Sequence, residues 1–225
     1  MLRFVLWGVY IVGGFFLGSV MFSKLIPEKL CAKNIEKESS DGNPGAANVF
    51  MNCGVSVGFL CLILDMLKGF VPVYLAVNSF GTDKLLISLV LIAPVLGHAV
   101  APLNRFHGGK CISTAFGELL ALLPVTYVVL ILAFFYILFS TLIKINPNRL
   151  RSIWAFSLFG VFAVPYLLFH SQVYVALGCA FIAITAIAKH TKHFESSKND
   201  APCIDKTEEQ YEDVDEEIPA SNVSN

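Results

Sequence analysis

Long apolar segments separated by short polar ones occupy most of the first 190 residues. Helices that cross a bilayer need about 20 apolar residues. Stretches of this kind lie at residues 4–22, 85–103, 112–143 and 153–188. A fifth stretch, residues 49–77, contains Asp65-Met66-Leu67-Lys68-Gly69 and Pro72, and we expect a broken helix there.

Two of these stretches are too long for one untilted span. Residues 112–143 are cut by Pro124, and residues 153–188 are cut by Pro165 and by His170-Ser171-Gln172. Because proline removes a helical donor and polar residues favour water, each stretch predicts two helices. The pattern therefore predicts about seven membrane segments.

The basic residues decide between five and seven segments. They gather in four polar segments, residues 24–37, 105–110, 144–151 and 189–198. Lysine and arginine are enriched in cytoplasmic loops of membrane proteins. Five helices would put residues 144–151 outside, whereas seven put all four basic segments inside. We predict an all-α polytopic membrane helix bundle of about seven transmembrane segments, with the N-terminus outside and the C-terminus cytoplasmic.

Composition agrees with a membrane protein. The 225 residues are 56% hydrophobic and 15% charged, with a mean hydropathy of +0.68, whereas soluble domains are about 45–50% apolar. The net charge of −1 gives no reason to expect a nucleic-acid partner. The six cysteines form no CxxC pair, so we expect neither a metal site nor a disulfide framework. Residues 1–190 form the predicted membrane domain, and residues 191–225 a disordered, acidic cytoplasmic tail.

A polar loop at residues 39–49 interrupts the apolar pattern. Gly42 and Gly45 can adopt a positive φ, and Pro44 fixes one φ between them. Asn43 and Asn48 add amides that donate and accept hydrogen bonds. Such a loop can direct several backbone N–H groups at one anion, although these residues are also typical of an ordinary turn.

A second polar segment contains Gly108-Gly109-Lys110 at the start of an apolar stretch. Here the backbone can approach a phosphate closely and Lys110 can add charge, or the residues can form a basic turn. The segment is not a P-loop, because Cys111 follows the lysine and no strand precedes it.

Ionisable residues also occur within the apolar segments. Asp65 and Lys68 are three residues apart, so on a helix they share one face. Charges at membrane depth are costly and point to function, but a structural ion pair is equally compatible with this spacing. His98 fits a packing role better than a ligand role.

Taken in order, these motifs resemble the bacterial integral-membrane acyl-phosphate:glycerol-3-phosphate acyltransferase family. The resemblance covers about residues 10–195. It rests on the following matches: Gly42-Asn43-Pro44-Gly45-Ala46 with Asn48, then Asp65, Lys68 and Gly69, then Gly97-His98, then Gly108, Gly109, Lys110 and Thr114, and finally His190.

Several positions depart from the family pattern. Asp41 stands where the family has Ser, Met51 where it has Arg, and Cys111 where it has Gly. Further departures are Ala47 for Thr, Ser113 for Ala, His193 for Asn and Ser196 for Arg. A carboxylate at position 41 weakens anion binding unless Asp41 points away or is paired.

The resemblance implies transfer of a fatty acyl group from acyl phosphate to the 1-hydroxyl of glycerol 3-phosphate, giving lysophosphatidic acid. It implies a multi-pass protein of the bacterial plasma membrane, active at the cytoplasmic face, without cofactor or metal. The implied catalytic residues are Lys110, His190 and Asn43. The implied substrate-binding residues are Asp41, Gly42, Gly45, Asn48, Lys68, Gly108, Gly109 and Thr114.

Other functions stay open at this point. His190 can act as a base or phosphate ligand, or can cap a helix end at the membrane interface. A catalytically impaired paralogue that binds a lipid precursor or regulates a partner enzyme is the main alternative. A transporter is disfavoured, because the polar groups gather at one face and not at the midplane.

Overall fold

The computed structural model describes residues 2–39 and 41–199, and the regular structure within these ranges is entirely helical. The elements, in chain order, are α1 (Leu2–Gly18), α2 (Phe22–Leu30), α3 (Ile35–Glu38), α4 (Ala46–Cys53), α5 (Val55–Phe80), α6 (Leu85–Val100), the 3₁₀ turn η1 (Pro102–Asn104), α7 (Ile112–Ala121), α8 (Val128–Thr141), α9 (Asn148–Phe169) and α10 (Val173–Asn199). The prediction of an all-α membrane helix bundle is confirmed.

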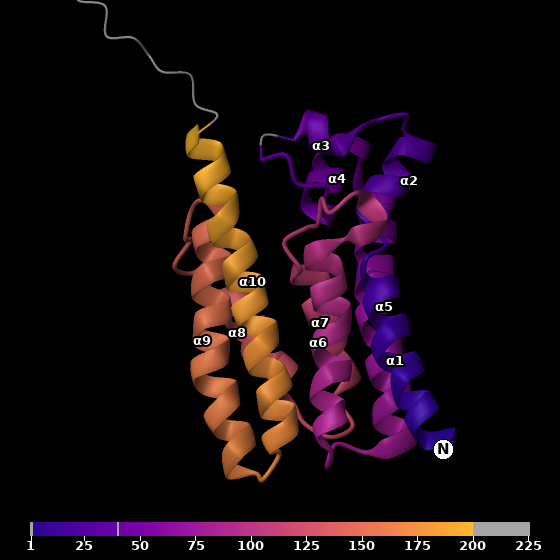
Figure 1. Ribbon diagram of the computed structural model, residues 1–225. Coiled ribbons are helices and arrows are strands. Elements are labelled where there is room, and N and C mark those ends of the chain that lie inside the picture. Colours follow the sequence, from indigo (N-terminus) through magenta and orange to yellow (C-terminus); the bar gives the residue numbers. More distant parts are fainter. Residues whose placement is uncertain (1, 40, 200–225) are drawn as a thin grey trace, which may run out of the picture.

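The long helices stand side by side, and the short helices α2, α3 and α4 cap one end of the bundle (Figure 1). Helix α5 packs on α7, α1 on α6, and α10 on both α6 and α9. Helix α6 is the most enclosed of the long helices, because it is covered by α1 on one side and α10 on another. The core therefore forms around α6, and the outer faces of α1, α5 and α9 are left for lipid.

Glycines allow the closest of these helix contacts. A Cβ built at Gly18 of α1 would lie 2.1 Å from the carbonyl oxygen of Pro94, and one at Gly97 of α6 would lie 1.9 Å from that of Phe15. Small residues are the usual means of close packing in membranes, where water does not drive helices together. Gly18 and Gly97 thus allow α1 and α6 to pack closely.

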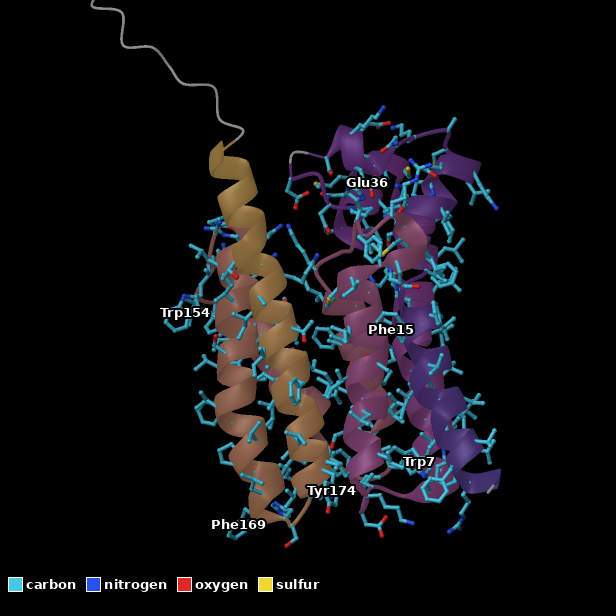
Figure 2. The ribbon with its side chains drawn as sticks, in the orientation of Figure 1. Trp7, Phe15, Glu36, Trp154, Phe169 and Tyr174 are labelled. Carbon is cyan, nitrogen blue, oxygen red and sulfur yellow. The ribbon has the colours of Figure 1, made fainter. Side chains whose placement is uncertain are left out.

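The two ends of the bundle differ in chemistry. Trp7, which is buried, stacks on Phe80 with ring centroids 4.4 Å apart at the end away from the cap. Glu36 lies at the capped end, where it pairs with Lys24 at 2.8 Å (Figure 2). Aromatic side chains favour a membrane interface. The uncapped end therefore carries an aromatic stack, and the capped end carries paired charges.

Two of the three predicted helix breaks are present. The chain leaves the helix between α7 and α8, around Pro124, and between α9 and α10, at residues 170–172. The break expected at residues 65–72 is wrong, because α5 is continuous from Val55 to Phe80. Its charged residues neutralise each other, and Pro72 lies within the helix.

Within the described part of the chain, four helices are long and apolar enough to cross a membrane: α5, α6, α9 and α10. The pair α1 and α2, bent by 46°, gives a fifth if it is counted as one span, and α7 and α8 are shorter apolar helices. The four basic segments lie at the capped end, and the N-terminus lies at the other (Figure 1). This placement agrees with the seven-segment arrangement, whose span count and orientation remain predictions.

The expected domain boundary at residue 190 does not coincide with the end of a helix. Helix α10 continues to Asn199, so the first residues of the predicted tail are helical. The remainder of that tail, residues 200–225, lies outside the described residues.

Single cysteines in a cysteine-free background would test the topology. We expect a membrane-impermeant maleimide to label Asp83→Cys from the outside only, and His107→Cys and Asn148→Cys from the cytoplasmic side only. All three positions are exposed in the structure, so accessibility reports the side of the membrane. Labelling of position 148 from the outside would contradict the seven-segment arrangement and restore five spans.

Candidate active site

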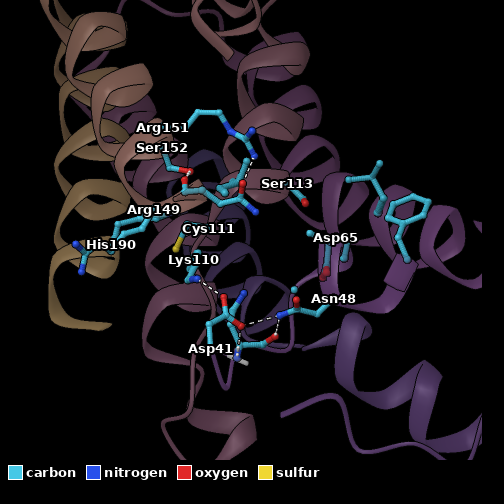
Figure 3. Close-up of a pocket in the computed structure, with 18 of the residues that line it drawn as sticks. Asp41, Asn48, Asp65, Lys110, Cys111, Ser113, Arg149, Arg151, Ser152 and His190 are labelled. Carbon is cyan, nitrogen blue, oxygen red and sulfur yellow. Dashed lines mark hydrogen bonds and ion pairs between the residues drawn. The ribbon is translucent and has the colours of Figure 1, made fainter. Parts of the chain in front are cut away.

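A cavity of about 320 Å³ lies at the capped end of the bundle (Figure 3). It is enclosed by the loop before α4, the residue pair before α7, the first turn of α9 and the last part of α10. Its polar lining includes Asp41, Asn43, Asn48, Lys110, Asn148, Arg149, Arg151, Ser152 and His190. Segments far apart in the sequence thus bring their polar side chains to one site.

Asn48 holds the loop before α4 in shape. Its buried Nδ2 donates to the carbonyl oxygen of Asn43 at 2.7 Å and to Oδ1 of Asp41 at 2.8 Å. Gly42 has φ +60°, the left-handed region that glycine favours. Gly45, with φ −91°, does not need that freedom, but a side chain there would collide with the Asn43 amide. The loop is therefore a fixed turn closed by one asparagine.

Asp41 is paired, which resolves the question raised by its place in an anion-binding loop. Its Oδ2 lies 2.5 Å from Nζ of Lys110, and its Oδ1 also accepts from the backbone N–H of Asn43 at 3.2 Å. Burial raises the pKa of the Asp41 carboxyl, but the hydrogen bond and charge of Lys110, with the Asn48 and Asn43 bonds, together lower it below its usual value. The carboxyl is therefore ionised at neutral pH.

Gly108 and Gly109 position Lys110 by packing against the end of α6. A Cβ at Gly108 would lie 2.0 Å from the carbonyl oxygen of Ala99, and one at Gly109 would lie 2.4 Å from Nε2 of His98. Both glycines therefore fit the chain closely onto α6. Neither lines the cavity. Their predicted role in substrate binding is thus supported only indirectly, because they position Lys110.

Several buried polar atoms of the cavity wall lack a hydrogen-bond partner among the described residues. Oδ1 of Asn43 and Nδ1 of His98 are among them, and both residues are less than a tenth exposed. Buried polar groups are nearly always satisfied in proteins. These atoms mark where a polar ligand would complete the site.

Helix α9 supplies a second set of polar groups that the sequence reasoning missed. Arg149, Arg151 and Ser152 line the cavity from its first turn. Nη2 of Arg151 donates to Oδ1 of Asn148 at 2.6 Å, and Oγ of the buried Ser152 donates to the carbonyl oxygen of the same residue. The charge of residues 144–151 by itself indicates only a basic turn. The signal was two arginines followed by a serine at the start of an apolar helix.

His190 reaches the cavity from α10 and is buried. Its Nδ1 lies 2.7 Å from the carbonyl oxygen of Ala186, one turn earlier in the helix. A carbonyl only accepts, so Nδ1 carries a proton. In the neutral imidazole, Nε2 is then the acceptor.

Lys68 does not line the cavity. Its fully buried Nζ pairs with Oδ1 of Asp65 at 2.8 Å and donates to the carbonyl oxygen of Val20 at 2.6 Å. Asp65 in turn accepts from Oγ of Ser23 at 2.5 Å. The structure therefore places Lys68 in a buried ion pair that ties α5 to the bend between α1 and α2.

Gly42, Thr114 and Met51 also lie outside the cavity lining. Thr114 is fully buried, and its backbone carbonyl faces Gly69 where α7 crosses α5. Met51, at the position where the family has Arg, is 73% exposed. Of the predicted site residues, the cavity therefore unites Asp41, Asn43, Gly45, Asn48, Lys110 and His190.

Comparisons with known proteins show to which family the chain is similar. Residues 8–199 match the sequence model of the glycerol-3-phosphate acyltransferase family. A glycerol-3-phosphate acyltransferase of Thermotoga petrophila is 40% identical over 135 residues, which are 60% of this chain and 68% of the relative. One from Aquifex aeolicus is 39% identical over 114 residues, covering 51% of this chain and 58% of the relative.

Solved structures extend the likeness over most of the chain. The crystal structure of PlsY (YgiH), an integral membrane glycerol 3-phosphate acyltransferase in its glycerol 3-phosphate form, matches with a TM-score of 0.72 and 29% identity. The match covers 86% of this chain and 92% of that protein. The chain therefore belongs to the glycerol-3-phosphate acyltransferase family of integral-membrane enzymes, and the resemblance seen in its motifs is confirmed.

Removal of the Lys68 ammonium should destabilise the bundle. Lys68→Met leaves the Asp65 carboxylate buried with only Ser23 beside it, and loss of one partner of a buried pair costs about 3–5 kcal/mol. We expect a lower midpoint of thermal unfolding in detergent, largely recovered when Asp65→Leu is added. Lys24→Met, which breaks a partly exposed pair, should cost less than about 1 kcal/mol. A Lys68→Met protein as stable as wild type would show that the pair contributes little.

Proposed function

We propose that this protein transfers a fatty acyl group from acyl phosphate to the 1-hydroxyl of glycerol 3-phosphate in this cavity. The hydroxyl oxygen bonds to the acyl carbon, the bond from that carbon to the phosphate oxygen breaks, and inorganic phosphate leaves with lysophosphatidic acid. The observation that carries the proposal is the meeting of Lys110, Asn43 and His190 from separate segments in one polar cavity.

The cavity offers cations for two phosphates. Lys110 faces it from before α7, and Arg149 and Arg151 face it from α9. An acyl phosphate and glycerol 3-phosphate are both anions, and preorganised donors stabilise the charge that develops on the reacting carbonyl. We assign Lys110 to one phosphate and, with the amide of Asn43, to that charge, and the α9 arginines to the other phosphate.

His190 is suited to accept the hydroxyl proton. Since Nδ1 is held by the Ala186 carbonyl, Nε2 is the ring nitrogen that carries the lone pair, and it would act as the base. The proton lost by the 1-hydroxyl would pass to Nε2 and then to the departing phosphate. The same contact fixes the ring within α10, which positions it for either step.

The cavity is too small to hold a whole acyl chain, which would therefore extend to the lipid side. About 320 Å³ is near the lower end of small-molecule sites, so it accommodates the polar groups and the reacting carbonyl. Apolar lining from Phe50, Leu62, Ile112 and the ring of Tyr136 would contact the first carbons of the chain. A product with one acyl chain would remain in the bilayer.

The main alternative, a catalytically impaired paralogue, is not favoured. Such a protein has no need to keep Lys110, Asn43 and His190 together, yet all three line the cavity. We place the protein in a bacterial plasma membrane with its active face cytoplasmic, because the cavity lies at the end that carries the basic segments.

Lys110→Ala should abolish acyl transfer without unfolding the protein. The change removes the ammonium that faces the cavity from the turn before α7. The assay uses palmitoyl phosphate and labelled glycerol 3-phosphate in detergent, with thermal unfolding as the check on folding. Lys24→Ala, which removes a lysine at the same end but outside the cavity, is the matched control and should keep its activity. Wild-type turnover in Lys110→Ala would remove this lysine from the mechanism.

The donor can be identified by product balance. With palmitoyl phosphate we expect one inorganic phosphate released for each lysophosphatidic acid formed, because the phosphate is the leaving group. Palmitoyl-coenzyme A at the same concentration should give no product. Equal rates with the thioester would contradict acyl phosphate as the donor while leaving the acceptor unchanged.

A further inference from the structure

The Asp41 carboxylate uses the donors that the sequence assigns to a substrate anion. Oδ2 is bound by Nζ of Lys110 at 2.5 Å. Oδ1 is bound by Nδ2 of Asn48 at 2.8 Å and by the backbone N–H of Asn43 at 3.2 Å. Figure 3 shows Asp41 joined in this way to both Lys110 and Asn48. The carboxylate therefore stands where a phosphate oxygen would stand.

The same contacts make the region electrically unfavourable for an incoming phosphate. The carboxylate neutralises Lys110 and adds a negative charge beside the cavity, and like charges at short range repel. A phosphate can use Lys110 fully only after the carboxylate has left it. Asp41 thus competes with the substrate for one cation.

The loop can release Asp41 without losing its fold. The Asp41 side chain is 40% exposed, whereas that of Lys110 is 14% exposed, so the carboxylate has access to water and the lysine stays inside. Asn48 keeps its second bond, to the carbonyl oxygen of Asn43, when Asp41 leaves. The residue that closes the loop is therefore distinct from the residue that would move.

We propose that Asp41 is an internal ligand of the phosphate site, which the substrate must displace, and that it thereby sets the affinity of this enzyme for glycerol 3-phosphate. The inference rests on the proposed function for the identity of the substrate, but not for the competition itself. Any phosphate that binds Lys110 competes with the same carboxylate. Asp41 is in this sense a specificity-determining residue that favours ligands able to outcompete a carboxylate.

The test compares the full chain in detergent with Asp41→Asn, which keeps the shape and an acceptor oxygen but loses the charge. Asp41→Ser loses the charge and shortens the side chain to a hydroxyl, and Asp41→Glu keeps the charge. Binding of inorganic phosphate is measured by titration calorimetry and by protection against thermal unfolding. Neither needs turnover. KM and kcat for glycerol 3-phosphate are measured separately with palmitoyl phosphate.

We expect Asp41→Asn and Asp41→Ser to bind phosphate at least about tenfold more tightly than wild type, in the range of one charge-assisted hydrogen bond. KM for glycerol 3-phosphate should fall in parallel, whereas Asp41→Glu should stay close to wild type. Glu36→Gln removes a carboxylate at the same end of the bundle that pairs with Lys24 and lies outside the cavity. As the matched control, it should leave phosphate affinity unchanged.

Equal or weaker phosphate binding by Asp41→Asn would overturn the proposal, as would an equal gain in Asp41→Glu or Glu36→Gln. Failure of both Asp41→Asn and Asp41→Ser to fold would also overturn it, because a substrate that displaced the carboxylate would break the same bonds. If no protein transfers acyl groups but phosphate binds more tightly to Asp41→Asn, the proposed function fails and the internal ligand stands.

Discussion

The buried pair of Asp65 and Lys68 is the interaction on which the capped end of the bundle depends. Charges inside a membrane protein are costly unless they neutralise each other and find hydrogen bonds. Here the pair also takes up the carbonyl oxygen of Val20 and the hydroxyl of Ser23, both at the bend between α1 and α2. One ion pair therefore fixes where α1 ends and where the cap begins. The loop with Asp41 lies in that cap, so its position depends on the same pair.

The same constraint explains why the polar cavity is built from short pieces. The backbone N–H and C=O groups of a loop need hydrogen-bond partners. In a membrane bundle such partners are found where helices end. The cap, the turn before α7 and the start of α9 all supply such ends on one side of the bundle. Close contacts at Gly108 and Gly109 then hold Lys110 against α6. Precision at the site thus comes from helix packing, although many residues that face the cavity lie in loops or near the ends of helices.

The helical class, the breaks around Pro124 and at residues 170–172, and part of the cavity could be predicted from the sequence. Apolar length and proline position are local properties, so they can be read along the chain. Continuity of α5 could not be predicted, because it depends on Asp65 and Lys68 satisfying each other. The position of Arg149 and Arg151 in the cavity could not be predicted from the sequence either. It depends on where packing on α8 and α10 places the start of α9, and charge alone indicated only a membrane side.

The departures from the family pattern affect side chains more than backbone. Cys111, where the family has glycine, keeps φ +66°, a conformation that costs a residue with a Cβ roughly 1–2 kcal/mol. Its buried thiol lies 3.6 Å from the carbonyl oxygen of Val95, so the added side chain fits against α6. Asp41 likewise occupies the loop without opening it, because Asn48 still closes the turn. Both departures thus leave Lys110 at the cavity, and under the proposed function they bear on how tightly an anion is held.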